Sequence, residues 1–182
     1  MRRSTYAFTI VELLVTIVIL AILALITSLV FSGIQNRTFD STIQHDLQTI
    51  AQLMETYKID NGKYPTGPLF TDYQTSLDTI KMKLSTGAYS PTRLDGNNAV
   101  NLVYLDENTS GSNYALVARS KSKKLYYITS LSRSPKEYTG TYAAGFPAVG
   151  NDNLAGDLGL DRTANNTYGY SIYNPPSFRH WN

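Results

Sequence analysis

The chain has 182 residues, which is room for one globular domain of ordinary size plus one long element. Its 16 Lys and Arg nearly balance its 14 Asp and Glu, and Arg2 and Arg3 account for the excess, so the body of the chain gives no reason to expect general nucleic-acid binding. The absence of cysteine excludes disulfides, thiolate metal sites and cysteine nucleophiles.

An apolar run near the amino terminus covers residues 8–31. A helix of about 24 residues, rising about 1.5 Å per residue, is long enough to cross a hydrocarbon layer of about 30 Å. Arg2 and Arg3 precede the run and are expected to keep that end in the cytoplasm, with the bulk of the chain outside. The run therefore predicts a single membrane-spanning helix.

One acidic residue, Glu12, interrupts this run. A carboxylate inside a bilayer costs about 2.5–3.5 kcal/mol on insertion scales, so a chain that needs only an anchor has no reason to carry it. If the chain were cut after Ala7, Phe8 would bear a free amine at the same depth. That amine could pair with Glu12 of a neighbouring copy, because opposite charges attract strongly in a low dielectric.

Residues 7–14, Ala-Phe-Thr-Ile-Val-Glu-Leu-Leu, resemble the processing site of type IV pilins and type II secretion pseudopilins. The resemblance implies that a membrane prepilin peptidase cuts between Ala7 and Phe8 and that Phe8 is then N-methylated. It also implies that Glu12 draws the subunit from a membrane assembly platform into a filament. Ala7 departs from the family pattern, which usually has Gly before the cut.

Two other interpretations of the amino terminus are weaker. A secretory signal peptide has an apolar region of about 7–15 residues followed by a small-residue cleavage site, and this run is longer and contains an acid. A plain signal anchor explains the length but leaves Glu12 unexplained. Leu29 and Ala21 stand where many pilins carry Pro and Gly, so local melting of the helix is less favoured here.

Beyond the membrane segment, residues 32–61 have the pattern of an amphipathic continuation of the same helix. From Phe39 to Tyr57 apolar residues recur every three or four positions, which is the period of one helical face. Asn61 and Gly62 predict the helix end, and Pro65 the stop. Residues 57–65 are also similar to the helix-end segment of pilins and pseudopilins. The leader is then 1–7, the membrane and filament-core helix 8–31, and the head 62–182.

Within the head, the pattern predicts a loop with room for one helix at 62–98, a β-meander at 99–131 and an irregular region at 132–182. The expected strands are 99–105, 113–119 and 124–131, and 168–173 is a candidate fourth. The possible inward-facing side chains are Leu102, Tyr104, Leu116, Ala118, Leu125, Tyr127 and Thr129. The predicted class is α+β, with the long amino-terminal helix packed against a small antiparallel sheet, which is the pilin fold that the resemblance implies.

The expected hairpin at 119–127 is basic and aromatic. Its cations are a candidate contact for DNA or an acidic surface, because cations gather phosphate and the neighbouring Tyr126 and Tyr127 could stack on bases. The alternative is a solvated hairpin whose lysines discourage edge pairing. The basic residues concerned are Arg119, Lys121, Lys123 and Lys124.

A cluster of carboxylates and amides follows the meander and could offer oxygen ligands to calcium, although its spacing matches no EF-hand. A polar loop is the alternative. The residues are Asn151, Asp152, Asn153, Asp157 and Asp161. The chain has two histidines, of which His45 is expected on the helix surface, and no nucleophile elbow, phosphate loop, zinc pattern or dinucleotide fingerprint. We therefore expect no enzymatic activity and, calcium aside, no cofactor.

Together these features predict a structural subunit that is anchored by one membrane-spanning helix, processed, and polymerised with other pilins into a filament on the cell surface. Two alternatives stay open. One is a pseudopilin of a type II secretion or DNA-uptake machine, which shares the same physics. The other is a signal-anchored surface binding protein that never polymerises, and this protein would tolerate Glu12→Leu.

Overall fold

The computed structural model describes residues 8–66, 76–77, 82–90, 102–106, 111–140, 156–160, 166–170 and 179–181. The chain divides into two compact units, Met1–Arg37 and Thr38–Asn182. Helix α1, Ile10–Asn61, supplies the described core of the first unit and the opening element of the second.

In the first unit, α1 is apolar on every side and almost fully uncovered. The described large apolar side chains from Phe8, just before the helix, to Ile34 are 51–84% exposed, the highest value belonging to Phe8. Hydroxyl groups bond within the helix, as where the Thr27 hydroxyl donates to the carbonyl of Leu23 at 2.7 Å. A helix that is apolar all round needs lipid or other helices around it. Among the described residues, α1 is the helix that is long and apolar enough to cross a membrane.

In the second unit, α1 buries one stripe of side chains. Ile43, Leu47, Ile50 and Met54 are spaced by four, three and four residues, and all four are 0% exposed. The helix ends at Asn61, and Gly62 follows with φ +76, its N–H donating to the carbonyl of Lys58 at 2.8 Å. The predicted amphipathic half and its glycine stop are therefore confirmed.

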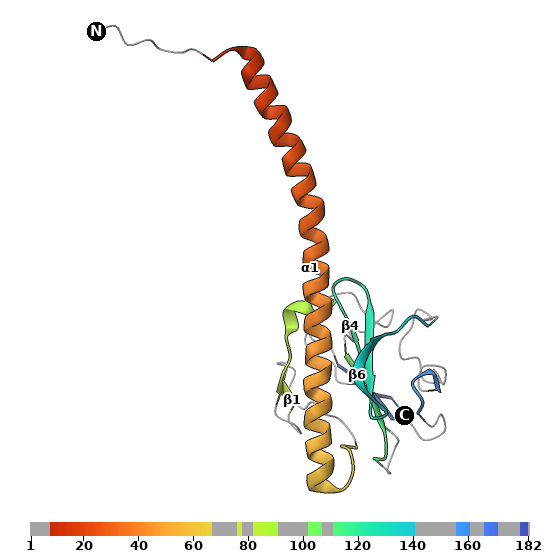
Figure 1. The fold of residues 1–182 in the computed structure, drawn as a ribbon. Coiled ribbons are helices and arrows are strands. Elements are labelled where there is room, and N and C mark those ends of the chain that lie inside the picture. The colour runs from red at the N-terminus through yellow and green to blue at the C-terminus, as the bar shows by residue number, and fades with distance from the viewer. Residues whose placement is uncertain are drawn as a thin grey trace, which may run out of the picture. The chain divides into compact units, whose positions relative to one another are not determined.

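An antiparallel sheet lies beside this part of α1 (Figure 1). The described strands of the sheet number six, in the order β6-β5-β4-β3-β7-β8. Strands β3 to β6 form a meander, and β7 pairs with β3 on its other side. A separate pair, β1 and β2, and a 3-10 turn, η1, occupy residues 76–88. The bounds are β1 Ser76–Leu77, β2 Met82–Lys83, η1 Thr86–Ala88, β3 Leu102–Asp106, β4 Tyr114–Arg119, β5 Leu125–Thr129, β6 Ser132–Glu137, β7 Asn166–Tyr170 and β8 Arg179–Trp181.

The sheet separates two buried clusters. The inner cluster joins the stripe of α1 to alternate residues of the central strands, and the outer cluster is covered by Leu158 and Leu160 of the 156–160 segment. Burial on both faces explains why β3 and β4 are apolar almost throughout, without the polar alternation of a half-solvated strand. The inner strand residues are Leu102, Tyr104, Tyr114, Leu116, Ala118, Tyr126 and Ile128, and the outer ones Val103, Leu105, Ala115 and Val117.

The predicted fold class is confirmed, and so are the inward faces of β3 and β4. The predicted face of β5 is wrong, because Tyr126 and Ile128 belong to the inner cluster while Leu125 and Tyr127 pack against the outer one. The turn fixes this register: it pairs Ala118 with Tyr126, and directly paired residues share a face. An error of one residue in the predicted register reverses every side chain of a strand.

The prediction of an irregular region at 132–182 is wrong for β6, β7 and β8. Strand β6 has the sequence Ser-Arg-Ser-Pro-Lys-Glu and no apolar alternation, because it is an edge strand with no buried side chain. The candidate fourth strand exists as β7, shifted to Asn166–Tyr170. Within the described residues the sheet therefore has six strands, where three or four are expected from the sequence.

The segment predicted as a loop at 62–98 contains the short strands β1 and β2. Its described helical element is the single 3-10 turn η1, in place of the one helix that the sequence allows. The predicted leader, residues 1–7, lies outside the described residues.

Candidate assembly site

The first turn of α1 holds Glu12 in a reciprocal arrangement with Thr9. Oε2 of Glu12 accepts from the Thr9 amide at 2.9 Å and from the Thr9 hydroxyl at 2.9 Å. In return the Glu12 amide donates to the Thr9 hydroxyl oxygen at 3.2 Å. Two amide donors at the start of a helix, which have no partner inside the helix, are satisfied in this way. Within a single chain, then, the carboxylate of Glu12 is not left bare.

The same carboxylate keeps further capacity to accept. The bonds described to it fall on Oε2, whereas Oε1 receives none among the described residues. The Thr16 hydroxyl donates to the Glu12 carbonyl and so competes for no carboxylate oxygen. An amine from another chain can therefore approach Oε1 without displacing Thr9.

Thr9 is a partner of Glu12 that the sequence analysis missed. The signal is present, because Thr-x-x-Glu directly before an apolar run is the pattern of a capping box. Phe8, the predicted methylated residue, lies just before the helix and is 84% exposed. Ala7, on the other side of the predicted cut, lies outside the described residues.

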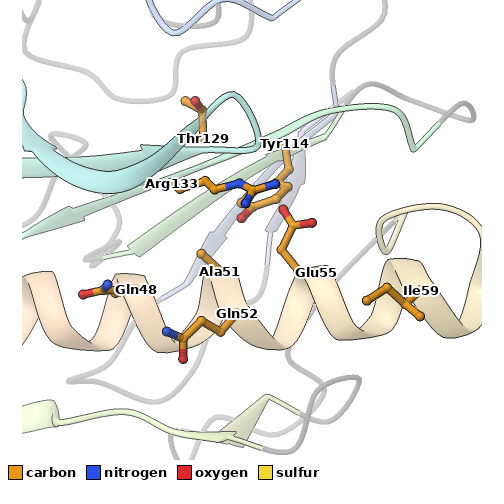
Figure 2. Close-up of a pocket in the computed structure, with 8 residues that line it drawn as sticks. All are labelled: Gln48, Ala51, Gln52, Glu55, Ile59, Tyr114, Thr129 and Arg133. Atoms are coloured by element: carbon orange, nitrogen blue, oxygen red, sulfur yellow. The ribbon is translucent and has the colours of Figure 1, made fainter.

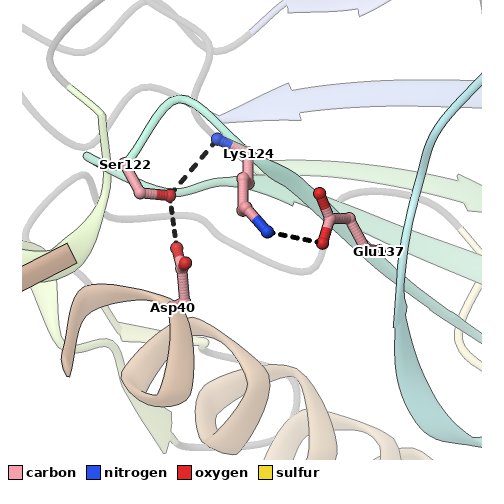
Figure 3. Close-up of polar contacts among 4 residues, drawn as sticks. All are labelled: Asp40, Ser122, Lys124 and Glu137. Carbon is pink, nitrogen blue, oxygen red and sulfur yellow. Dashed lines mark hydrogen bonds and ion pairs between the residues drawn. The ribbon is translucent and has the colours of Figure 1, made fainter. Parts of the chain in front are cut away.

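The four basic residues at 119–124 do not form one uniform cationic patch. Arg119 and Lys121 are half-buried, and the Lys121 ammonium lies 5.3 Å from the centre of the Phe39 ring. Lys124 pairs with Glu137 at 2.8 Å, which raises the pKa of that lysine, while Lys123 is exposed. Figure 3 shows the turn held against α1, since the Ser122 hydroxyl donates to the carboxylate of Asp40. Contact with DNA stays a prediction.

Of the calcium candidates, Asp157 is described. It accepts a hydrogen bond from the Tyr138 hydroxyl at 2.9 Å, and burial together with this bond raises the pKa of Tyr138 to about 12. Asp152 and Asp161 lie outside the described residues. No group of three or more His, Cys, Asp or Glu able to hold a metal occurs in the part of the chain that the structure describes. His45 is exposed on α1, as expected.

A pocket of about 440 Å³ opens between α1 and the sheet (Figure 2). Its carboxylate, Glu55, accepts from the Tyr64 hydroxyl at 2.8 Å, and the guanidinium of Arg133 lies on the facing wall. Burial, the bond to Glu55 and its charge raise the pKa of Tyr64 to about 12. The lining residues are Gln48, Ala51, Gln52, Glu55, Ile59, Tyr114, Thr129 and Arg133. No sequence pattern indicates this pocket, because its walls come from distant segments.

Comparison with known proteins agrees with the geometry of the amino terminus. Residues 2–28 match the model of the prokaryotic N-terminal methylation motif. The chain is 32% identical over 65 residues to the type II secretion system core protein G of Klebsiella michiganensis, a match covering 36% of this chain and 46% of that protein. The chain thus spans about half the length of this relative. No solved structure matches the present chain. It carries a prepilin-type amino terminus and resembles the pilins and pseudopilins, as predicted from residues 7–14.

Proposed function

We propose that this chain is a structural subunit of a type IV pilus-like filament. The observation that carries the proposal is Glu12, placed in the first turn of an uncovered apolar helix and directly within the methylation motif. A membrane anchor that acts alone gains nothing from a carboxylate at that depth, whereas in a polymer the carboxylate can pair with the terminal amine of the neighbouring subunit.

The working sequence is insertion, removal of residues 1–7 by a prepilin peptidase, methylation of Phe8, and transfer from the membrane assembly platform into the filament. The single helix spans the inner membrane with its amino end in the cytoplasm until transfer, and the heads then face outward from the filament. Moving a large apolar side chain out of water gains about 1.5–3 kcal/mol, so about ten side chains of the exposed run outweigh the cost of Glu12 severalfold when the helix inserts into the membrane.

The proposal is tested by Glu12→Leu in the full-length chain, with Thr16→Val as the matched control because Thr16 lies one turn later and bonds only backbone carbonyls. We expect Glu12→Leu to insert normally, to be cleaved, and to lose most of the filament yield measured by shearing and sedimentation. Thr16→Val should retain the wild-type yield. Filaments at normal yield from Glu12→Leu would refute the proposal.

A second candidate is a pseudopilin of a secretion machine, and the similarity to core protein G favours it. It uses the same amino-terminal chemistry but builds a short rod inside the cell envelope. Electron microscopy of intact cells at native expression separates the two, since long surface filaments indicate a pilus and their absence, with subunit retained in the envelope, indicates a pseudopilus.

A further inference from the structure

The turn at residues 120–124 is ordered by hydrogen bonds within the turn and to α1. The Ser120 amide donates to the Lys124 carbonyl at 2.9 Å, and the Lys123 amide donates to the Ser120 carbonyl at 2.9 Å. The Ser122 side chain then ties the turn to Asp40 on α1. A segment that is already ordered loses little conformational entropy when it binds.

Lys123 stands apart from the other lysines of this turn. It is exposed and has φ 75, the only positive φ among the described residues other than glycine. The ion pair found in the described part of the chain joins Lys124 and Glu137, so Lys123 has no carboxylate partner there. A bulky residue held at positive φ and left uncovered is a reason to look for a function.

The pocket described above has the complementary chemistry. The Tyr64 hydroxyl engages Oε1 of Glu55, and Oε2 has no partner among the described residues. Ile59, one turn beyond Glu55 on α1, is 82% exposed, so the pocket offers apolar contact for the stem of a lysine and a carboxylate for its ammonium. Asp40 and Glu137 flank the turn; within their own chain they hold Ser122 and Lys124, and they carry the charge opposite to that of Arg133.

The turn and the pocket lie at different ends of the same domain. Asp40, which holds the turn, and Glu55 are fifteen positions apart on α1, or about 22 Å at about 1.5 Å per residue. Because the turn is fixed at its own end, it cannot enter the pocket of its own chain. A contact between unlike surfaces of two copies is heterologous, and it generates an open helical polymer when its rotation does not close into a ring.

We propose that the 120–124 turn of one copy seats Lys123 in the Glu55 pocket of the next copy along the filament. This inference rests on the proposed function and names a contact between heads, separate from the pairing of Glu12 in the helical core.

The test uses Gln52→Cys, an exposed position in the pocket wall, in a chain with no native cysteine. Sheared filaments are treated with a short thiol-to-amine cross-linker and digested for mass spectrometry. We expect a ladder of covalent multimers in which Cys at 52 is joined to Lys123. The control is Ser134→Cys, which is exposed next to Arg133 but does not line the pocket, and it should give little ladder.

A charge exchange gives a second readout. Lys123→Glu and Glu55→Lys are each expected to lower filament yield at least fivefold, and the double variant to recover at least half of the wild-type yield. Glu55→Lys removes the acceptor of Tyr64, so Glu55→Gln, which keeps an acceptor and loses the charge, is measured beside it.

The outcomes distinguish the two proposals. If the wild-type chain forms no filament, the proposed function fails. If filaments form and Lys123 is absent from the cross-links, or if Lys123→Glu assembles at the wild-type yield, the head contact proposed here is wrong and the proposed function stands.

Discussion

Replacing Asp46 by Ala is predicted to loosen the segment 84–90 from α1. Asp46 is 2% exposed, and its carboxylate accepts from the Ser85 amide at 2.8 Å, the Ser85 hydroxyl at 2.9 Å and the Tyr89 hydroxyl at 3.2 Å. The same segment bonds the sheet, since the Ser90 amide donates to the Arg119 carbonyl and the Lys121 amide to the Ala88 carbonyl. Asp46 therefore links α1 to the base of the 120–124 turn.

The size of the effect follows from which donors water can reach. Ser85 is exposed and regains water, so its two bonds are replaced at small cost. Tyr89 is 0% exposed and loses its hydrogen bond to the Asp46 carboxylate. A hydrogen bond to a charged group contributes about 1.5–3 kcal/mol, and the cavity left by the carboxylate adds to the loss. Removing the buried Asp46 carboxylate also removes the free-energy cost of keeping that charge out of water, which offsets part of the loss. We expect a net loss of about 2–4 kcal/mol, or roughly 4–16 °C in the thermal midpoint for a domain of this size.

The assay is thermal unfolding of the full chain in detergent, followed by near-ultraviolet circular dichroism, together with hydrogen exchange of the peptide covering residues 84–90. His45→Ala is the matched control, because His45 adjoins Asp46 in sequence but is exposed, and it should change stability by less than about 0.5 kcal/mol. If Asp46→Ala matches that control and the Ser85 amide keeps its protection, the link between helix and segment is not what the structure indicates.

Three further predictions concern the second unit. Gly111 has φ +56, and a Cβ there would lie 2.8 Å from the Tyr64 carbonyl oxygen, so Gly111→Ala should cost about 1–3 kcal/mol while Gly87→Ala, with open space, should be near neutral in the same thermal assay. Burial and the neighbouring Asp46 raise the pKa of Tyr89 well above 10, so Tyr89 stays protonated in the folded chain at a pH where it ionises in the unfolded chain. The free energy of unfolding should therefore fall above pH 10, by up to about 1.4 kcal/mol per pH unit. Urea unfolding at a series of pH values should show a shallower fall for Tyr89→Phe than for the wild type. The Asp157 carboxylate already accepts a hydrogen bond from Tyr138, so we expect millimolar calcium or a chelator to move the thermal midpoint by less than about 2 °C. A larger rise with calcium would indicate that the ion binds near Asp157.

The helix and its carboxyl end are predictable from the sequence, because periodicity and glycine stops are local. The spacing of Ile43, Leu47, Ile50 and Met54 alone shows a helical period, and these are the side chains that α1 buries. Glu12 is identified for a physical reason, its cost in an apolar run, and the comparisons support the motif around it.

The rest of the head cannot be predicted in the same way. Strand β6 carries no apolar pattern, because an edge strand with exposed side chains needs none. The inward face of β5 depends on a turn register that the alternation of Leu125 to Thr129 leaves ambiguous. The pocket at Glu55 joins α1 to β4, β5 and β6, and such long-range proximity is invisible to a window of sequence.

Mass spectrometry of the amino-terminal peptide of the mature protein tests whether residues 1–7 are removed and Phe8 is methylated. We expect a peptide that begins at Phe8 and carries an added methyl group on its amine. A mature protein whose first residue is still Met1 would contradict it, because the amine needed opposite Glu12 would never form at that depth.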